Sequence, residues 1–538
     1  MTLLAVNALD LSIYGRRILK NVSLSIAKGE VLGVIGESGS GKSMTAFSVM
    51  QLLPKGALCS GEIRIDGQDV LSLSEKALCK IRGRRIGMVF QEPMTALNPL
   101  KTIGDQVAET ILVHERVPRS DAMMRARDAL ARAELPEDKF PLSRYPHELS
   151  GGQRQRVVIA MAIALCPALL IADEPTTALD VTTQAEILKL LTRLVKEDGM
   201  GLLLITHDLA VVADVADKIA IMRKGEVVEE GPVAILSEGL QHPYSRALLA
   251  ASSHQPTRDA GGNGQVLLKV QNVVRDYPVP RQGLWGKPGH FRAVNDVSFT
   301  IRRGESVGLV GESGCGKSTL TRAILGLEAV QGGQITVGGD PVFMGNTVNR
   351  DVRRRMQVVF QDPYSSFNPR HRVDRLITEP FHLLETAPTG AERDRAIAQA
   401  LESVGLVEAD RYKFPHEFSG GQRQRIAIAR ALIIRPDLII LDEAVSALDV
   451  SVRAQVLDLL ADLSDRFNLT YLFISHDLSV VRSITDRVLV MQSGAIVEQG
   501  ITAEVFDNPQ HPYTQQLINA APKLPIQKPK GETHVPTP

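Results

Sequence analysis

The chain has 538 residues, too many for a single hydrophobic core, and its length predicts at least two domains. Apolar residues make up 44% and charged residues 23%, as in ordinary globular proteins. The 61 basic and 61 acidic residues balance, so net charge gives the chain no attraction to nucleic acid or anionic lipid. The four cysteines are scattered without the spacing of a metal site, which is typical of free thiols in a reducing compartment.

The longest apolar run covers residues 157–172 and contains Pro167. It is shorter than the roughly 20 residues that a membrane-spanning helix needs. A helix followed by a buried strand fits this run better. The first residues lack the basic segment and the cleavage site of a signal peptide. We therefore expect neither a signal peptide nor a transmembrane segment.

Apolar residues alternate along residues 5–14 and predict an antiparallel strand that ends in Tyr14. A second apolar run, 31–35, leads through a glycine-rich loop into a helix-like segment. The loop consists of Gly36, Glu37, Ser38, Gly39, Ser40, Gly41, Lys42 and Ser43. A strand, such a loop and a helix form a P-loop, whose backbone N–H groups and helix N-terminus hold phosphates. We expect Lys42 to reach the β- and γ-phosphates of ATP and Ser43 to ligate Mg²⁺.

The middle of this half, residues 95–147, has helical periodicity. Short, continuously apolar runs at 168–172 and 201–206 then predict buried strands. The polar residues directly after these runs are Asp173, Glu174 and His207. Apolar strands that alternate with helices predict an α/β domain with a mostly parallel sheet covered on both faces. Such sheets bind ligands at the carboxyl ends of their strands.

The whole pattern recurs in the second half of the chain, where Lys317 lies 275 positions after Lys42 and Asp442 lies 269 positions after Asp173. The second P-loop region consists of Gly311, Glu312, Ser313, Gly314, Cys315, Gly316, Lys317, Ser318 and Thr319. A nearly constant offset indicates duplication of a whole domain. We predict a first domain over residues 1–252, a flexible linker over 253–265, a second domain over 266–520 and a disordered tail over 521–538.

Each half has a further motif between its P-loop and its Asp-Glu pair. The motifs are Ser150, Gly151, Gly152 and Gln153 in the first half and Ser419, Gly420, Gly421 and Gln422 in the second. Together with the P-loops they resemble the signature of ABC transporter ATPases, and the resemblance covers nearly the whole chain. It implies two tandem P-loop NTPase domains of the ABC type, each with a mostly parallel sheet core, an antiparallel β subdomain and a helical subdomain. It also implies ATP hydrolysis, with ATP and Mg²⁺ as cofactors.

The resemblance assigns catalytic roles to residues after the strands. Glu174 and Glu443 would orient or deprotonate the attacking water. The switch histidines that contact the γ-phosphate would be His207 and His476, and the Q-loop residues that sense Mg²⁺ and water would be Gln91 and Gln361. Taken alone, an Asp-Glu pair after a strand could equally be a solvated helix cap, and a lone histidine there is more often a capping residue.

The resemblance also implies binding roles. The metal ligands would be Ser43, Gln91, Asp173, Ser318, Gln361 and Asp442, with Asp173 and Asp442 acting through water. Tyr14 and Tyr277 would stack on adenine, although each could instead be an ordinary strand aromatic. Asp180 and Asp449 match the D-loop.

In this family the signature motif of one copy binds the γ-phosphate of ATP held by the other copy. One composite site would therefore join Lys42, Glu174 and His207 to residues 419–422. The other would join Lys317, Glu443 and His476 to residues 150–153. Neither half lacks a key residue, so we expect two hydrolytic sites, with ATP closing the domains head-to-tail and hydrolysis releasing them.

Cys315 lies inside the second P-loop, at the start of a predicted helix. A helix N-terminus favours the thiolate form of cysteine. We therefore expect a maleimide to modify Cys315 and to inactivate this site, and Mg-ATP to protect it.

Three further motifs narrow the class: Tyr145-Pro146-His147-Glu148 with Phe414-Pro415-His416-Glu417, the Asn-Pro segments after each Q-loop, and His242-Pro243-Tyr244 with His511-Pro512-Tyr513. Together they resemble the peptide/nickel importer subfamily in its fused form. This resemblance implies uptake of di- or oligopeptides or glutathione through two integral-membrane permease subunits. A periplasmic solute-binding protein would deliver the substrate, and the chain would lie on the cytoplasmic face of the bacterial inner membrane.

Two alternatives stay open. The solute could be nickel, an opine or another small molecule, because specificity lies mostly in the other subunits. A soluble ABC ATPase acting on ribosomes or DNA is the rival class. Such proteins carry long charged helical arms, zinc modules or coiled coils, whereas this linker is short and rich in Gly and Pro, so we expect no nucleic-acid partner.

Overall fold

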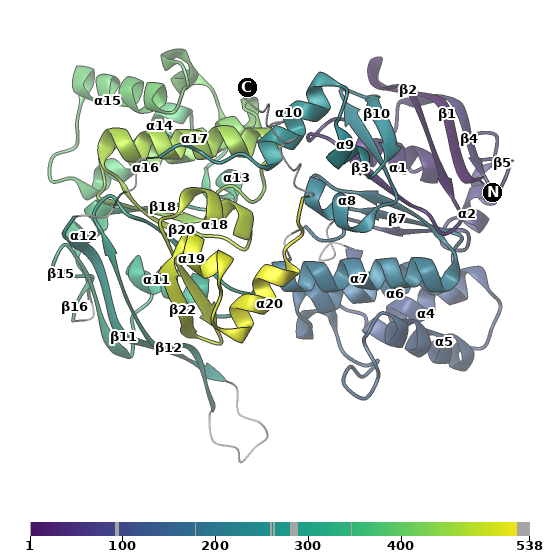
Figure 1. Cartoon of the computed structure of the whole chain (residues 1–538), viewed down its shortest axis with the longest axis horizontal. Helices are drawn as coiled ribbons and strands as arrows, with labels where there is room; N and C mark the ends of the chain where they lie inside the picture. Colours follow the sequence, from purple (N-terminus) through teal and green to yellow (C-terminus); the bar gives the residue numbers. More distant parts are fainter. Residues whose placement is uncertain are drawn as a thin grey trace, which may run out of the picture. The chain divides into compact units, whose positions relative to one another are not determined.

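The computed structural model describes residues 2–91, 96–177, 179–258, 261, 264–279, 289–345 and 347–524. Within these residues the chain forms two compact units, coloured from purple to teal and from teal to yellow along the sequence in Figure 1. Among the described residues, unit 1 consists of those in 2–179, 183–253 and 522–524, and unit 2 of those in 180–182 and 254–521. The domain, linker and tail boundaries stay predictions, and most of the predicted tail lies outside the described residues.

Unit 1 contains a four-stranded antiparallel sheet, in the order β2-β1-β4-β5, and a six-stranded sheet, in the order β10-β9-β3-β8-β7-β6. The larger sheet is parallel from β9 to β6, and β10 pairs with its edge antiparallel. The strands are β1 (Thr2–Ile13), β2 (Arg16–Ala27), β3 (Val31–Ile35), β4 (Ala57–Ile65), β5 (Gln68–Asp69), β6 (Ile86–Val89), β7 (Leu169–Asp173), β8 (Gly201–Ile205), β9 (Lys218–Arg223) and β10 (Glu226–Pro232).

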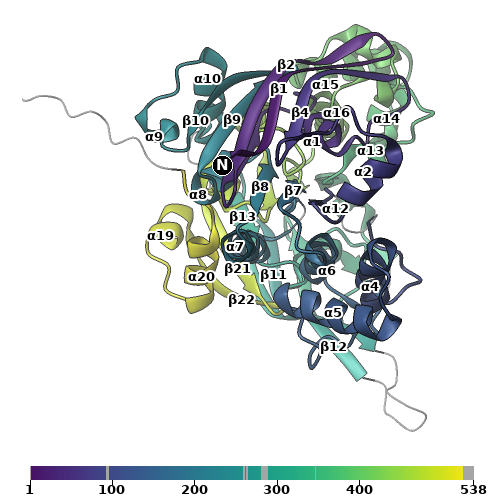
Figure 2. The ribbon, with the colours of Figure 1, turned by 90° about the vertical axis from the view of Figure 1, so that its right-hand side faces the viewer.

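Helices cover the larger sheet of unit 1, and they explain why all five residues of β3, β7 and β8 are buried. The helices are α1 (Lys42–Met50), α2 (Glu75–Ile81), α4 (Ile103–His114), α5 (Arg119–Arg132), η1 (Pro146–Glu148), α6 (Gly151–Ile163), α7 (Val181–Asp198), α8 (Leu209–Val215), α9 (Ile235–Glu238) and α10 (Pro243–Ser252). Helices α4, α5 and α6 lie together, apart from the antiparallel sheet of β1, β2 and β4 (Figure 2). These are the predicted helical and antiparallel β subdomains.

Unit 2 repeats this plan with a four-stranded sheet, β12-β11-β14-β15, and a six-stranded sheet, β18-β19-β20-β13-β21-β22. A two-stranded ribbon, β16-β17, is added. The strands are β11 (Val266–Val279), β12 (Gly289–Arg302), β13 (Ser306–Val310), β14 (Gly332–Val337), β15 (Asp340–Pro341), β16 (Phe343–Met344), β17 (Thr347–Val348), β18 (Met356–Val359), β19 (Leu438–Asp442), β20 (Thr470–Ile474), β21 (Arg487–Gln492) and β22 (Ala495–Ile501).

The helices of unit 2 follow the same order as those of unit 1. They are α11 (Lys317–Ile324), α12 (Arg350–Arg355), α13 (Pro363–Ser366), α14 (Val373–Ile377), η2 (Glu379–Leu383), α15 (Gly390–Ser403), η3 (Glu408–Tyr412), η4 (Pro415–Glu417), α16 (Gly420–Leu432), α17 (Val450–Phe467), α18 (Leu478–Ile484), α19 (Thr502–Asp507) and α20 (Pro512–Ala520). The predicted α/β fold class, with two mostly parallel sheet cores, is confirmed. No helix in the described ranges has both the length and the apolar character that crossing a bilayer requires.

The strand register sets where the functional residues emerge. In unit 1, Ile205 of β8 pairs with both Val34 of β3 and Asp173 of β7. The P-loop, Glu174 and His207 follow these positions by one or two residues, so all of them leave the same edge of the sheet. In unit 2, Ile474 pairs in the same way with Leu309 and Asp442.

The described part of the predicted linker contacts unit 2. His254 Nε2 lies 2.6 Å from Asp458 Oδ1 of α17. Arg258 donates hydrogen bonds to Asp486 Oδ2 at 3.0 Å and to the Gly304 carbonyl at 2.7 Å. The side chain of Arg258 is only 7% exposed, so the beginning of this segment is anchored on unit 2.

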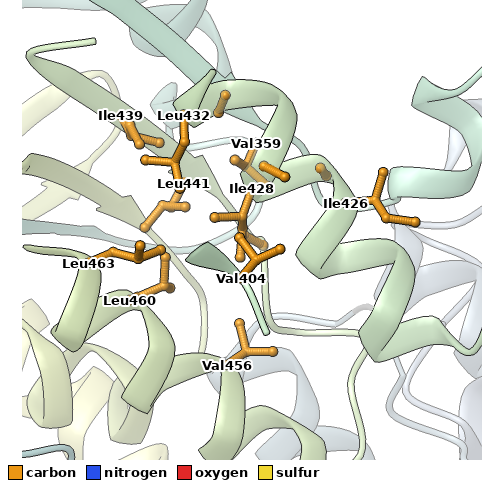
Figure 3. Packing of buried hydrophobic residues seen from close by; sticks show 14 of the residues in the cluster. Val359, Val404, Ile426, Ile428, Leu432, Ile439, Leu441, Val456, Leu460 and Leu463 are labelled. Carbon is orange, nitrogen blue, oxygen red and sulfur yellow. The ribbon is translucent and has the colours of Figure 1, made fainter. Parts of the chain in front are cut away.

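A hydrophobic cluster joins the sheet of unit 2 to its helices. Val359 of β18 and Leu441 of β19 pack with residues of α16 and α17, among them Ile428 and Leu460 (Figure 3). Leu460 is 1% exposed. The helices are amphipathic, and this cluster is the surface on which their apolar sides are buried.

We predict that Leu460→Ala lowers the free energy of unfolding by about 2–5 kcal/mol, because it removes buried methyl groups and leaves a cavity. Urea unfolding of the full chain, followed by circular dichroism, measures the change. Val407→Ala is the control, since Val407 is 62% exposed. Equal effects of the two substitutions would contradict the importance of this cluster.

Candidate functional site

The P-loop of unit 1 turns sharply between β3 and α1. Gly36 has φ 152° and Gly41, the N-cap of α1, has φ 106°. A Cβ atom on Gly36 would lie 2.2 Å from the carbonyl oxygen of Met222, so no other residue fits there. Lys42 Nζ donates hydrogen bonds to the carbonyls of Gly36, at 2.7 Å, and Glu37, at 3.0 Å. The lysine is therefore held over the loop that would cradle the phosphates.

Unit 2 has the same loop geometry. Gly311 has φ 153° and Gly316 has φ 96°. Lys317 Nζ donates to the carbonyls of Gly311, at 2.9 Å, and Glu312, at 3.2 Å. Both predicted P-loops thus have a fold that suits a phosphate chain, although the binding roles of their residues stay predictions.

Asp173 lies at the end of β7 and is 3% exposed. It accepts a hydrogen bond from Ser43 Oγ at 3.1 Å. Burial raises the pKa of Asp173, and the hydrogen bond from Ser43 offsets this only in part. Burial likewise raises the pKa of Asp442 in unit 2, and the neighbouring charge of Glu443 adds to the effect. A buried carboxylate beside a serine hydroxyl is a donor set that suits Mg²⁺, which prefers oxygen ligands.

Glu174 follows β7 with φ 47°, a conformation that is uncommon for residues other than glycine. Its backbone N–H donates to the carbonyl of Ile205 at 2.9 Å. Its Oε2 accepts hydrogen bonds from Gln91 Nε2 and Thr177 Oγ1, both at 2.9 Å. His207 Nδ1 lies 3.4 Å from the same oxygen. The structure therefore brings together three of the predicted residues, Gln91, Glu174 and His207.

In unit 2, His476 Nδ1 lies 3.2 Å from Glu443 Oε1. Glu443 has φ 50° and donates its N–H to the Ile474 carbonyl at 2.9 Å, like its counterpart. Within the described part of the chain, no hydrogen bond joins Gln361 to Glu443. The two glutamate sites thus share the histidine but not the glutamine contact.

Both glutamates stay ionised for the same physical reason. Burial alone would raise the pKa of Glu174, but the hydrogen bond and the charge of His207, with Thr177 and Lys42, lower it below its usual value. Burial would also raise the pKa of Glu443, and His476 and Lys317 lower it in the same way. An ionised carboxylate can accept a proton from water.

The N-caps of α8 and α18 are the aspartates that directly follow the two histidines. Asp208 is the N-cap of α8 and accepts the Ala210 N–H at 2.8 Å. Asp477 is the N-cap of α18 and accepts the Ser479 N–H at 2.9 Å. The interpretation of His207 and His476 as helix caps is therefore wrong.

The signature motifs form the first turns of α6 and α16. Ser150 Oγ accepts the Gln153 N–H at 3.3 Å, while Gln153 Oε1 accepts the Ser150 N–H at 3.0 Å. Residues 419–422 form the same capping box. Gly152 is buried, and a Cβ atom there would lie 2.3 Å from Thr183 Cγ2. Ser150 and Ser419 are exposed. The composite sites, which would join residues of different units, stay a prediction.

The two tyrosines predicted to bind adenine differ in their surroundings. Tyr14 is 81% exposed. The Tyr277 hydroxyl donates a hydrogen bond to Glu328, and the Arg275 guanidinium lies 4.8 Å from the centre of its ring. Stacking on adenine stays a prediction for both residues.

The expectation that Cys315 favours the thiolate form is wrong. Its side chain packs in the core beneath the P-loop and is 7% exposed. Burial raises the pKa of the Cys315 thiol more than the nearby charge of Lys317 lowers it. The sequence shows the helix N-terminus but not the apolar residues that enclose the sulfur.

Two contacts were missed in the sequence. Thr177 lies three residues after Glu174 and bonds its carboxylate, and only this short spacing could have indicated the pair. Tyr244 Oη accepts the N–H of Glu37 in the P-loop at 3.2 Å, across 207 residues of sequence. In the sequence, the His242-Pro243-Tyr244 motif indicates the subfamily but not this contact. Of the predicted Q-loop segment, Glu92–Thr95 lies outside the described residues.

Comparison with known families identifies the chain. Residues 19–177 and 294–446 match the family model described as "ABC transporter". The chain belongs to the ABC transporter family. Its two units are ABC-type ATPase domains, so the predicted family, fold and enzyme class are confirmed. Residues 497–537 match a second model, "Oligopeptide/dipeptide transporter, C-terminal region".

Several curated proteins resemble this ABC protein over most of their length. The glutathione import ATP-binding protein GsiA of Escherichia coli is 46% identical, over 94% of this chain and 86% of that protein. The peptidoglycan transport ATP-binding protein YejF of Agrobacterium fabrum is 47% identical, over 93% of this chain and 92% of that protein. Among solved structures, the ATP-binding cassette MJ0796 in a dimeric post-hydrolysis state bound to ADP and Pi is 35% identical, covering 43% of this chain and 98% of its own, with a TM-score of 0.39.

We predict that His207→Ala raises the pKa of Glu174 and moves the acid limb of ATP hydrolysis to higher pH. The pKa of Glu174 in the folded chain lies below the ordinary value of a glutamate. The paired carboxylate therefore stabilises the fold above that value, and the stabilisation is lost as pH falls through the depressed pKa. Without His207, burial dominates and protonation occurs at higher pH.

The pH–rate profile of ATP hydrolysis is measured in a Glu443→Gln background, so that unit 1 carries the turnover. His382→Ala is the control, because His382 is an exposed histidine of unit 2. An acid limb that stays in place in His207→Ala would show that His207 does not set the ionisation of Glu174.

We predict that N-ethylmaleimide modifies Cys79 and Cys166 well before Cys315, because the first two are exposed and the third is buried. In a chain with Cys59, Cys79 and Cys166 replaced by serine, modification of Cys315 is slow at pH 7 and accelerates with pH. Mass spectrometry follows the modified peptides over time. Rapid modification of Cys315 at neutral pH would contradict this prediction, because it would show that the thiol is ionised there despite its burial.

Proposed function

We propose that this chain is the ATP-hydrolysing subunit of a bacterial ABC importer for peptides, di- or oligopeptides or glutathione-like compounds. The observation that carries the proposal is the match of residues 497–537 to the C-terminal region of oligopeptide and dipeptide transporters. The relatives named for glutathione import and peptidoglycan transport support it, since both names concern peptide-containing solutes. The alternatives of nickel or opine uptake have no such support.

Each unit would hold ATP through its P-loop, with Lys42 or Lys317 on the β- and γ-phosphates. Mg²⁺, when bound, neutralises charge on the phosphates. The residues that would hold it are Ser43, Gln91 and Asp173 in unit 1 and Ser318, Gln361 and Asp442 in unit 2. Glu174 and Glu443 accept a proton from the attacking water or orient it, and the paired histidines keep both carboxylates ionised.

The two units would work as a pair. In this proposal, residues 150–153 complete the site of unit 2, and residues 419–422 complete the site of unit 1. Fusion in one chain makes the encounter of the two units intramolecular, at an effective concentration set by the linker. ATP binding then closes the pair, and hydrolysis at two sites opens it again.

The partners follow from the role as an ATPase subunit. Two integral-membrane permease subunits would form the pathway, and a periplasmic binding protein would deliver the solute to them. The chain would lie on the cytoplasmic face of the inner membrane, bound to the permeases. Because the solute contacts those proteins, they and not this chain would set most of the specificity.

We predict that a Glu174→Gln/Glu443→Gln double variant abolishes uptake of one class of peptide in cells. The amide keeps the shape of each side chain but cannot accept the proton of water. Uptake of labelled di- and tripeptides, with glutathione included, is compared with wild type at matched protein level. Each single variant serves as a partial control, and similar losses in both indicate two working sites.

Uptake that is unchanged for every peptide, together with lost ATP hydrolysis in the purified double variant, would overturn the peptide proposal alone. The ATPase assignment would then remain, and nickel and opines would be tested in the same cells.

A further inference from the structure

A tyrosine near the C-terminus of each unit contacts that unit's P-loop. Tyr513 Oη accepts the backbone N–H of Glu312 at 2.9 Å. Tyr244 Oη accepts the N–H of Glu37 at 3.2 Å. Glu312 and Glu37 are the second residues of the two loops. The same contact therefore occurs twice, once in each compact unit, between segments about 200 residues apart in sequence.

The tyrosine of unit 2 is held rigidly. It is 4% exposed and lies in the first turn of α20, directly after Pro512. His511 is the N-cap of this helix, and its Nδ1 accepts the Tyr513 N–H at 3.2 Å. The carboxylate of Glu498, on β22, accepts the N–H groups of Gln510 at 2.8 Å and His511 at 3.1 Å. Strand β22 thus fixes the start of α20, and α20 fixes the hydroxyl.

Unit 1 has the same hydrogen bonds at the start of α10. Glu229 of β10 accepts the N–H groups of Gln241 at 2.6 Å and His242 at 3.2 Å. His242 Nδ1 accepts the Tyr244 N–H at 3.2 Å. In both units, the same set of hydrogen bonds therefore connects the edge strand to the P-loop through the His-Pro-Tyr motif.

The contact bears on the lysine that binds phosphate. In unit 2 the backbone of Glu312 is held at both ends, its N–H by Tyr513 and its carbonyl by Lys317 Nζ at 3.2 Å. Rotation of this residue would move the carbonyl on which the lysine rests. The hydroxyl of Tyr513 opposes that rotation.

We propose that Tyr244 and Tyr513 are positioning residues for ATP, which hold the second residue of each P-loop and thereby keep the loop and its lysine ready to bind phosphate. The C-terminal segment that marks this subfamily then contributes to nucleotide affinity. The proposal concerns ATP binding, and it does not depend on which solute is transported.

The test uses the full chain with Lys42→Ala, so that nucleotide binding reports on unit 2. Tyr513→Phe keeps the ring and removes only the hydroxyl. We expect the affinity for a fluorescent ATP analogue to fall about threefold to tenfold, the effect of losing one backbone hydrogen bond. Equilibrium titration requires neither permease nor solute, so a failure of the importer proposal would leave this result intact.

Tyr471→Phe is the matched control. Tyr471 is a fully buried tyrosine of the same unit, and its hydroxyl donates to the Leu460 carbonyl at 3.0 Å, away from the P-loop. It should lower the unfolding temperature without changing nucleotide affinity. Unchanged affinity in Tyr513→Phe, or an equal loss in Tyr471→Phe, would reduce the tyrosine to a structural role. Tyr244→Phe in a Lys317→Ala chain repeats the measurement in unit 1, and serves if Tyr513→Phe does not fold.

Discussion

The candidate site in each unit depends on the parallel pairing of three central strands. In unit 1, Ile205 pairs with both Val34 and Asp173, so β3, β8 and β7 end at one level. The phosphate loop, the carboxylates and the histidine come from three distant parts of the sequence, and this register alone makes them neighbours. All five residues of each strand are buried under helices on both faces, so the strands stay in the core up to the edge where the site residues emerge.

Within that frame, two adjacent carboxylates have their pKa values moved in opposite directions. Burial raises the pKa of Asp173, whereas for Glu174 the effects of His207, Thr177 and Lys42 together outweigh burial and lower the pKa. The nearby cationic groups do not fully compensate the burial of the Asp173 carboxylate. The neighbouring carboxylate of Glu174, in contrast, is paired with His207 and ionised. Neighbouring groups whose pKa values are moved apart in this way are typical of functional sites that carry out acid–base chemistry.

The sequence predicts the parts of the site that depend on local chemistry. The P-loops need glycines at fixed places, as the Cβ contact at Gly36 shows, and the strands need continuous apolar runs. Prediction from the sequence fails for features that depend on packing between distant parts of the fold. The helix N-terminus at Cys315 is local, but the burial that raises its pKa comes from distant strands. The contact of Tyr244 with Glu37 spans 207 residues and has no local signal beyond its motif.

The duplication separates what the fold imposes from what each copy has added. Both glutamates have a positive φ, the same backbone bond and a histidine partner. Thr177 gives the carboxylate of Glu174 a further donor, but its counterpart Ser446 donates instead to the backbone carbonyl of Glu443, at 2.9 Å. The carboxylate of unit 2 therefore depends more on its histidine. The two sites share one plan, but the carboxylate of Glu174 has two side-chain donors, Gln91 and Thr177, that the carboxylate of Glu443 lacks in the described part of the chain. The hydroxyl at the threonine position turns toward the carboxylate in unit 1 and toward the backbone in unit 2.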